Sequence, residues 1–251
     1  MITYNRIPHF RFLSKLQILH LQNITSVHSD IFGFVPYLQR IKIVECSLIN
    51  DFIDLSNKGH LHKIILHKTA VNFQPEKFCS GNILLKTLNI SSGGITKLPR
   101  TLFKHCSQLT NLILSSNEIR QIDSYFGGFY NYNLQLLDLS NNFISTVDLK
   151  FVEKCILLHK IDLSNNRIYH LNLRFSYLFG TSISISMNMS GNMESLYAAC
   201  FFFNSRETLL VRNNRFEECS TSMNYSFPVT SIRINGNKCN GVDPELCVIR
   251  H

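Results

Sequence analysis

The chain has 251 residues, of which 45% are hydrophobic and 17% are charged, and its formal net charge is +8 at pH 7. The apolar fraction is sufficient for a sizeable packed core, and the charged fraction is lower than is average for soluble domains. Because no stretch approaches about 18 consecutive apolar residues, the sequence predicts no transmembrane helix.

In chain order, a short N-terminal segment is followed by ten copies of one pattern. The pattern is clearest at 109–119 (LTNLILSSNEI), 134–144 (LQLLDLSNNFI) and 158–168 (LHKIDLSNNRI). Apolar residues occupy positions 1, 4, 6 and 11, and Asn occupies position 9. The repeats start near residues 16, 38, 61, 85, 109, 134, 158, 184, 206 and 229. This spacing predicts a solenoid, because a single repeat cannot bury its apolar face alone.

Each repeat is expected to contain a short parallel strand. Leu109, Leu112 and Leu114 alternate with residues that would face solvent. An Asn at position 9 can bond the backbone of the turn that leaves the strand. The C-terminal six repeats have this residue: Asn117, Asn142, Asn166, Asn192, Asn214 and Asn237. The first four have Ile24, Cys46, Thr69 and Gly93 instead, so we expect the N-terminal repeats to be less regular.

The pattern LxxLxLxxNxI, which extends from Leu16 to Cys239, resembles the leucine-rich repeat family. The segment LPRTLF at 98–103 resembles the longer repeat of extracellular members, and the repeats are similar to those of Toll-like receptor ectodomains and secreted arthropod leucine-rich repeat proteins. The resemblance implies one α/β-type repeat domain over residues 1–251, a leucine-rich repeat solenoid shaped as a curved horseshoe. It would have a parallel β-sheet on its concave face and irregular, 3-10 or short helical segments on its convex face.

The two ends depart from the regular pattern. Residues 1–15 resemble part of a preceding repeat, and residues 237–251 resemble a partial C-terminal cap. Arg6, Arg11 and Lys15 interrupt the apolar residues near the N-terminus, so no signal peptide is predicted. A solenoid needs a polar cap over its first core edge, and none is visible, so we expect the chain to be a fragment.

The chain has eight cysteines, which we separate by their positions in the repeats. Five recur at repeat positions and are expected to be inert buried thiols: Cys46, Cys79, Cys106, Cys155 and Cys200. The three disulfide candidates are Cys219, Cys239 and Cys247, the last two within a segment that resembles an extracellular cysteine-bearing cap. With no CxxC pair and dispersed histidines, the sequence predicts no metal site and no cofactor.

Four Asn-x-Ser/Thr sequons are glycosylation candidates, at Asn23, Asn89, Asn188 and Asn224. Together with the repeat type, they favour an extracellular or cell-surface location. The missing signal peptide keeps a cytoplasmic location as the alternative.

The variable strand positions give a charge map of the predicted concave face. Its N-terminal third is basic and its middle carries one pair of carboxylates on neighbouring strands. The candidate ligand-binding residues are His20, Arg40, Lys42, His62, Lys63, His67, Lys68, Lys86, Asp138 and Asp162. A basic strip of this size can attract an acidic protein, a sulfated glycan or a nucleic acid. Nucleic acid is disfavoured because no exposed aromatic residues alternate with the basic ones.

No catalytic motif is present. The sequence lacks a phosphate-binding glycine loop, an HExxH motif and a GxSxG elbow, and Asp138 and Asp162 belong to a repeated DLS phrase. We therefore expect a non-catalytic module that binds a protein or glycan on its concave face, as a receptor ectodomain or a secreted protein, compatible with a homo- or hetero-dimer. An intracellular scaffold or adaptor and a structural matrix or adhesion component are the alternatives.

Overall fold

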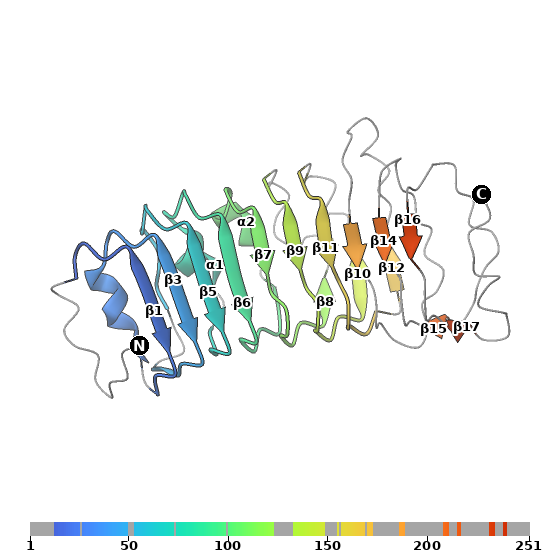
Figure 1. Cartoon of the computed structure of the whole chain (residues 1–251), viewed down its shortest axis with the longest axis horizontal. Helices are drawn as coiled ribbons and strands as arrows, with labels where there is room; N and C mark the ends of the chain where they lie inside the picture. The colour runs from blue at the N-terminus through green and yellow to red at the C-terminus, as the bar shows by residue number, and fades with distance from the viewer. Residues whose placement is uncertain are drawn as a thin grey trace.

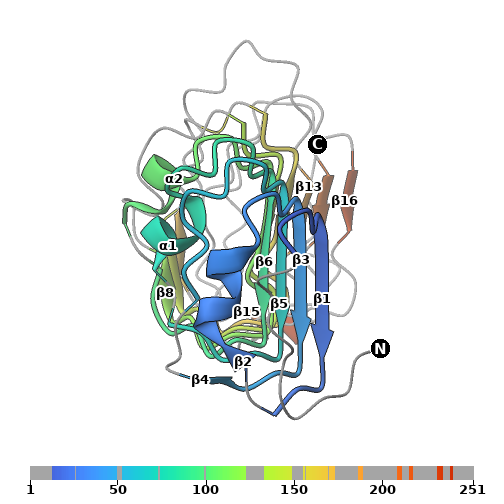
Figure 2. The same ribbon diagram turned by 90° about the vertical axis from the view of Figure 1, so that its left-hand side faces the viewer.

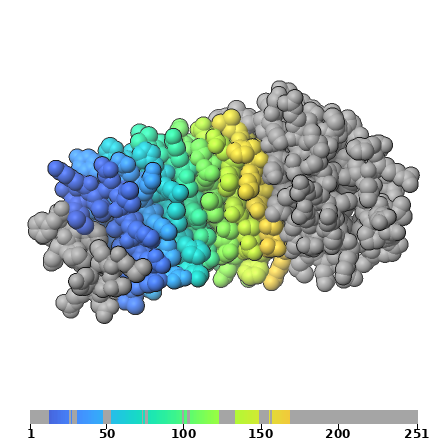
Figure 3. Space-filling view, in the orientation of Figure 1, coloured from blue at the N-terminus to red at the C-terminus, as the bar shows by residue number. Residues whose placement is uncertain are grey.

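The computed structural model has one continuous row of repeats. The residues that it describes are 13–25, 27–49, 53–72, 74–98, 100–122, 133–148, 155, 157–168 and 170–172, with the short segments 186–188, 208–210, 215–216, 231–233 and 238–239. The space-filling view shows the described N-terminal repeats packed side by side along one axis (Figure 3).

A ten-stranded parallel sheet forms one face, with its strands in chain order (Figure 1). The strands are β1 (Ile18–Gln22), β3 (Arg40–Val44), β5 (Lys63–His67), β6 (Thr87–Ser91), β7 (Asn111–Ile113), β9 (Leu136–Asp138), β11 (Lys160–Asp162), β13 (Ser186–Asn188), β14 (Thr208–Leu210) and β16 (Ser231–Arg233). Equivalent repeat positions are register partners on neighbouring strands, so side chains at one position form a column across the sheet.

The return segments form a second layer opposite the sheet (Figure 2). The helices in this layer are η2 (Ser29–Phe34), α1 (Pro75–Cys79) and α2 (Leu102–His105). The short strands are β2 (Val27–His28), β4 (Leu48–Ile49), β8 (Gln121–Ile122), β10 (Thr146–Asp148), β12 (His170–Asn172), β15 (Arg215–Phe216) and β17 (Lys238–Cys239). They make small parallel sheets of two or three strands. The predicted solenoid, with a parallel sheet and few helices, is confirmed.

The repeated apolar positions fill the space between the two layers. Leu109, Leu112 and Leu114 are fully buried, as are their equivalents in the neighbouring repeats. Burial of one such side chain contributes about 1.5–3 kcal/mol. Two phenylalanines of the return layer, Phe32 and Phe78, also lie in this core. The apolar positions of the repeat therefore make one continuous core.

The position-9 asparagines bond the backbone of two consecutive turns. Asn117 Oδ1 accepts hydrogen bonds from the backbone N–H groups of Gly93 at 2.9 Å and Ile95 at 3.1 Å. Its Nδ2 donates to the carbonyls of Ile90 and Leu114, at 2.7 and 3.0 Å. Asn142 and Asn166 make equivalent bonds. The ladder is confirmed for these three; the side chains of Asn192, Asn214 and Asn237 lie outside the described residues.

The prediction of less regular N-terminal repeats is wrong for the strands. The first four strands each have five residues, although their repeats lack the position-9 Asn. One backbone bond is common to both groups of repeats. The N–H at position 8 donates to the position-7 carbonyl of the next repeat, both in the first repeat (Asn23 to Val44, 3.0 Å) and in a later one (Ser116 to Ser140, 2.9 Å). Side-chain identity at position 9 does not affect this bond.

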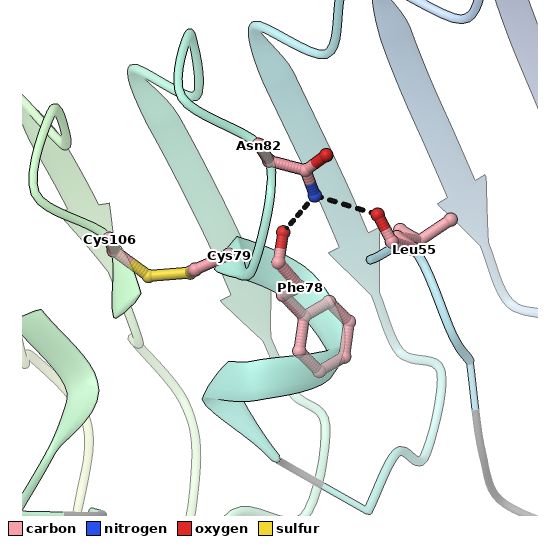
Figure 4. The surroundings of a disulfide bond; sticks show 5 residues. All are labelled: Leu55, Phe78, Cys79, Asn82 and Cys106. Atoms are coloured by element: carbon pink, nitrogen blue, oxygen red, sulfur yellow. Dashed lines mark hydrogen bonds between the residues drawn. A yellow bond between two sulfur atoms is a disulfide. The ribbon is translucent and has the colours of Figure 1, made fainter. Parts of the chain in front are cut away.

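Two cysteines that we expected to be thiols form a disulfide, Cys79–Cys106 (Figure 4). Cys79 is the last residue of α1, and Cys106 lies 27 residues later, directly after α2. Because the solenoid brings equivalent return segments together, their Cα atoms are 4.9 Å apart, within the range for a disulfide. Repeat position alone predicted burial correctly but missed the pairing, because the two residues occupy different positions of their repeats.

A further buried bridging amide, Asn82, lies beside the disulfide (Figure 4). Its Nδ2 donates to the carbonyls of Leu55 and Phe78, and its Oδ1 accepts from the N–H of Lys58 at 2.7 Å. This side chain joins the second layers of two repeats. The pattern did not identify it, because it lies three residues before a repeat start and has no counterpart in the repeated phrase.

Cys46 and Cys155 are buried thiols, as expected from their repeat positions. Cys46 Sγ donates to the carbonyl of Val44, which partly replaces the asparagine ladder. Burial raises the pKa of the Cys155 thiol from 9.0 to about 12. Cys200, Cys219 and Cys247 lie outside the described residues, as does the side chain of Cys239.

Candidate binding surface on the sheet

The outer face of the first four strands carries a group of cations. Arg40 and Lys63 are register partners at position 3, and His20 and Lys42 are register partners at position 5. These four side chains are exposed, as is Lys86 at position 2 of the next repeat. We call Arg40, Lys42, Lys63 and Lys86 the basic strip. Neighbouring strands are about 4.8 Å apart, so the strip concentrates like charges within a few strand widths.

No cation of the basic strip has an acidic partner within the described part of the chain. One acid nearby, Glu45, forms an ion pair with Lys68 at 2.7 Å. The hydrogen bond and charge of Lys68 lower the pKa of Glu45 below its ordinary value. The other ion pair among the described residues, Lys77–Asp54, involves a lysine of the second layer. Like charges on adjacent strands repel each other, and an anionic ligand would relieve this repulsion.

The two remaining histidines of the candidate set are half-buried. His67 lies within 2.9 Å of the Ser91 hydroxyl through its Nδ1, which ties the ring to the neighbouring strand. His62 is the register neighbour of Lys86 at position 2. These residues border the basic strip but are less accessible than its cations.

The two candidate aspartates lie on neighbouring strands, but each carboxylate forms hydrogen bonds within the turn that follows its own strand. Asp138 and Asp162 are register partners on β9 and β11. In each, Oδ1 accepts hydrogen bonds from the backbone N–H and the hydroxyl of the serine two residues on, Ser140 or Ser164, at 2.6–3.0 Å. The DLS phrase therefore stabilises the turn that leaves the strand. This role accounts for the repeated aspartate without a ligand.

The sequons differ in accessibility. Asn23 is exposed in a turn, where its backbone has a φ of 55°, and Thr25 is exposed as well. Asn89 is half-buried in the middle of β6 between Ile65 and Ile113, and its Oδ1 has no hydrogen-bond partner among the described residues. The side chain of Asn188 and the whole of residue 224 lie outside the described residues.

An exposed apolar edge lies beside the basic strip and was missed by the sequence analysis. Tyr37, His60 and Leu84 each directly precede a repeat start, and all three are exposed. The rings of Tyr37 and His60 are 5.6 Å apart between centroids. Ile83, next to Leu84, is 70% exposed. The sequence signal that could have indicated this edge is the residue before position 1, which the consensus pattern leaves undefined.

The described residues contain no group of three or more His, Cys, Asp or Glu side chains arranged to hold a metal ion. Among the same residues, none of the helices has the length and apolar character needed to cross a membrane.

Comparison with protein families gives a match to the leucine rich repeat model over residues 83–131. Among curated proteins, the leucine-rich repeat-containing G-protein coupled receptor 5 of Rattus norvegicus is 28% identical over 137 residues. That alignment covers 54% of this chain and 15% of the receptor. The chain thus spans a small part of the length of this relative.

Two solved structures show the same fold. TLR13 in its complex with ssRNA13 superposes with a TM-score of 0.64 at 21% identity, covering 90% of this chain and 37% of that one. A chain of the LRIM1/APL1C complex superposes with a TM-score of 0.60 at 19% identity, covering 89% of this chain and 36% of that one. At these identities, the likeness concerns the fold.

Proposed function

We propose that the chain, whose residues 83–131 match the leucine rich repeat model, is a non-catalytic recognition module that binds a protein or glycan across the outer face of its ten-stranded sheet. Leucine-rich repeat domains are typically protein-binding and non-catalytic. The observation that carries the proposal is the basic strip, whose exposed cations have no acidic partner among the described residues. Cations held in register on a rigid sheet are preorganised for an anionic surface.

We place this module outside the cell, in a receptor ectodomain or a secreted protein. The Cys79–Cys106 disulfide supports this location, because disulfides persist mainly in oxidising compartments. The exposed sequon at Asn23 agrees with it. The curated relative, a receptor with leucine-rich repeats, favours the same assignment.

The similar structures favour macromolecular partners. One was solved as the TLR13–ssRNA13 complex and another as the LRIM1/APL1C complex, the latter between two named chains. Hetero-dimerisation is therefore part of the proposal. Nucleic acid is less favoured for this chain, because the exposed aromatic side chain near the basic strip, Tyr37, precedes β3 and does not lie between the cations of the strip.

An intracellular scaffold is the second candidate. The buried thiols of Cys46 and Cys155, which are not disulfide-bonded, favour it, since cytosolic proteins keep such cysteines reduced. The Cys79–Cys106 pair argues against it. Peptide mapping of the natural protein under non-reducing conditions separates the two candidates. Recovery of the 79–106 cross-link supports the extracellular assignment, and two alkylated cysteines in its place support the scaffold.

A binding screen tests recognition directly. The purified chain is immobilised and exposed to a panel of secreted proteins and ectodomains and to a glycan array. A variant with Arg40→Glu, Lys42→Glu and Lys63→Glu is compared with the control K97E/K104E, which reverses exposed charges in the return segment. We expect ligand capture by the wild type and the control and loss of capture by the strip variant. Equal capture by all three proteins would place the binding site elsewhere.

A further inference from the structure

The apolar edge and the basic strip lie together on the first four repeats, and their combination narrows the class of ligand. The edge consists of Tyr37, His60 and Leu84, which directly precede the repeats that carry Arg40, Lys42, Lys63 and Lys86, together with Ile83 beside Leu84. This inference rests on the proposed function, because it concerns the ligand of the same face.

The distances follow from strand geometry. Position 5 of a repeat lies five residues after the residue that precedes the repeat start, which corresponds to about 16 Å along a strand. The edge and the strip belong to the repeats of β3, β5 and β6, and from β3 to β6 is two strand spacings, or about 10 Å. The flat footprint of edge and strip together is therefore about 160 Å², well below the roughly 800 Å² per partner of a standard protein interface. A short segment matches this area better than a whole globular surface does.

The side chains of the surface specify two kinds of contact. Tyr37 is 52% exposed and Ile83 is 70% exposed, so both lose apolar surface to water when a ligand covers them. The adjacent cations Arg40, Lys42 and Lys63 need anionic groups within reach. A purely anionic polymer would pair with the cations and leave the edge uncovered, whereas a polypeptide can supply both apolar and acidic side chains.

We propose that the first four repeats bind an extended acidic peptide segment of a partner protein, which lies along the strands. Apolar residues of that segment pack on Tyr37 or Leu84 at the edge, and at least two acidic residues pair with Arg40, Lys42 or Lys63. An extended segment of about six residues spans roughly 20 Å, enough to cover the path from the edge to position 5.

A displayed library of random 16-residue peptides tests the proposal. The library is selected on the full chain and counter-selected on the R40E/K42E/K63E variant, and a selected peptide is then synthesised. We expect the selected sequences to combine Asp or Glu with a nearby aromatic or aliphatic residue. The peptide should bind the charge variant at least about tenfold more weakly, because its acidic groups then meet like charges.

The edge is tested separately with Y37S/L84S. Both side chains are exposed, so the substitutions leave the core intact. We expect about tenfold weaker peptide binding by this variant, in line with the loss of two partly buried apolar contacts. K97E/K104E should bind as the wild type does, and equal urea midpoints for all variants confirm that they are folded.

Heparin oligosaccharides and phosphatidylserine vesicles are tested alongside the peptide. If either binds more tightly than any selected peptide and Y37S/L84S has no effect, the ligand is an anionic polymer or a lipid surface. The peptide proposal then fails while recognition by the sheet face stands. If the charge variant retains every ligand that the wild type binds, the proposed function of this face fails too.

Discussion

Asn117→Ala is the most informative perturbation of the fold, because the Asn117 side chain joins two turns of the solenoid. It is almost fully buried, and its Oδ1 accepts from the N–H groups of Gly93 and Ile95. A buried donor left unsatisfied costs about 1–3 kcal/mol. If water partly satisfies the two donors, we expect the free energy of unfolding to fall by about 3 kcal/mol. This is a large part of the usual 5–15 kcal/mol of domain stability.

Urea unfolding followed by far-UV circular dichroism measures this loss. The control is Glu118→Ala at the next residue, which is exposed and keeps its backbone bond to the Ile95 carbonyl. We expect Asn117→Ala to unfold at clearly lower urea concentration with a similar m-value, and the control to match the wild type. A decrease below about 1 kcal/mol for Asn117→Ala would refute the bridging role that we assign to the amide.

Three further predictions concern the second layer and the core. Gly81→Ala should destabilise the chain by about 2–4 kcal/mol, because Gly81 has a φ of 72° and an added Cβ would lie 2.9 Å from the Cα of Asn57. Replacing both Cys79 and Cys106 by Ser should lower the free energy of unfolding by about 3.5 kcal/mol, as expected for a cross-link between residues with a sequence separation of 27. Cys155 should resist iodoacetamide in the native state at pH 8 and react on unfolding, because burial raises its pKa to about 12.

Each of these predictions has its own check. Gly33→Ala is the control for Gly81, since a Cβ at Gly33 meets no atom within 4 Å; equal urea midpoints for the two variants would contradict the clash. An unchanged midpoint for the double cysteine variant would show that the disulfide adds no stability. For Cys155, the unfolded thiol ionises above about pH 9 while the native thiol remains neutral, so stability should fall between pH 9 and 12. A Cys155→Ser variant with an unchanged pH profile would contradict this assignment.

The fold could be predicted because its determinants recur. Leu109, Leu112 and Leu114 occupy positions that each of the first seven repeats fills with an apolar residue, so their burial followed from the period alone. The ladder role of Asn117 followed in the same way. The disulfide could not be predicted from repeat position, because Cys79 and Cys106 occur at different offsets and meet only when the return segments stack.

The candidate site was predicted in part. The column arrangement placed Arg40 and Lys63 side by side, as the strand register shows. The sequence could not show that the Asp138 carboxylate bonds Ser140, since an aspartate at that position is equally compatible with a solvated side chain. The edge around Tyr37 was missed because the consensus leaves the residue before position 1 unspecified, and only the structure shows that it is exposed.

Lysine footprinting shows whether a ligand covers the N-terminal part of the sheet face. The chain is acetylated with and without the ligand found in the screen, and labelling rates are measured by mass spectrometry at each lysine. Recognition by this face predicts slower labelling of Lys42 and Lys63 in the presence of ligand and unchanged labelling of Lys97 and Lys104, which are exposed in the return segment. Protection of Lys97 and Lys104 with unchanged labelling of the two sheet lysines would contradict it.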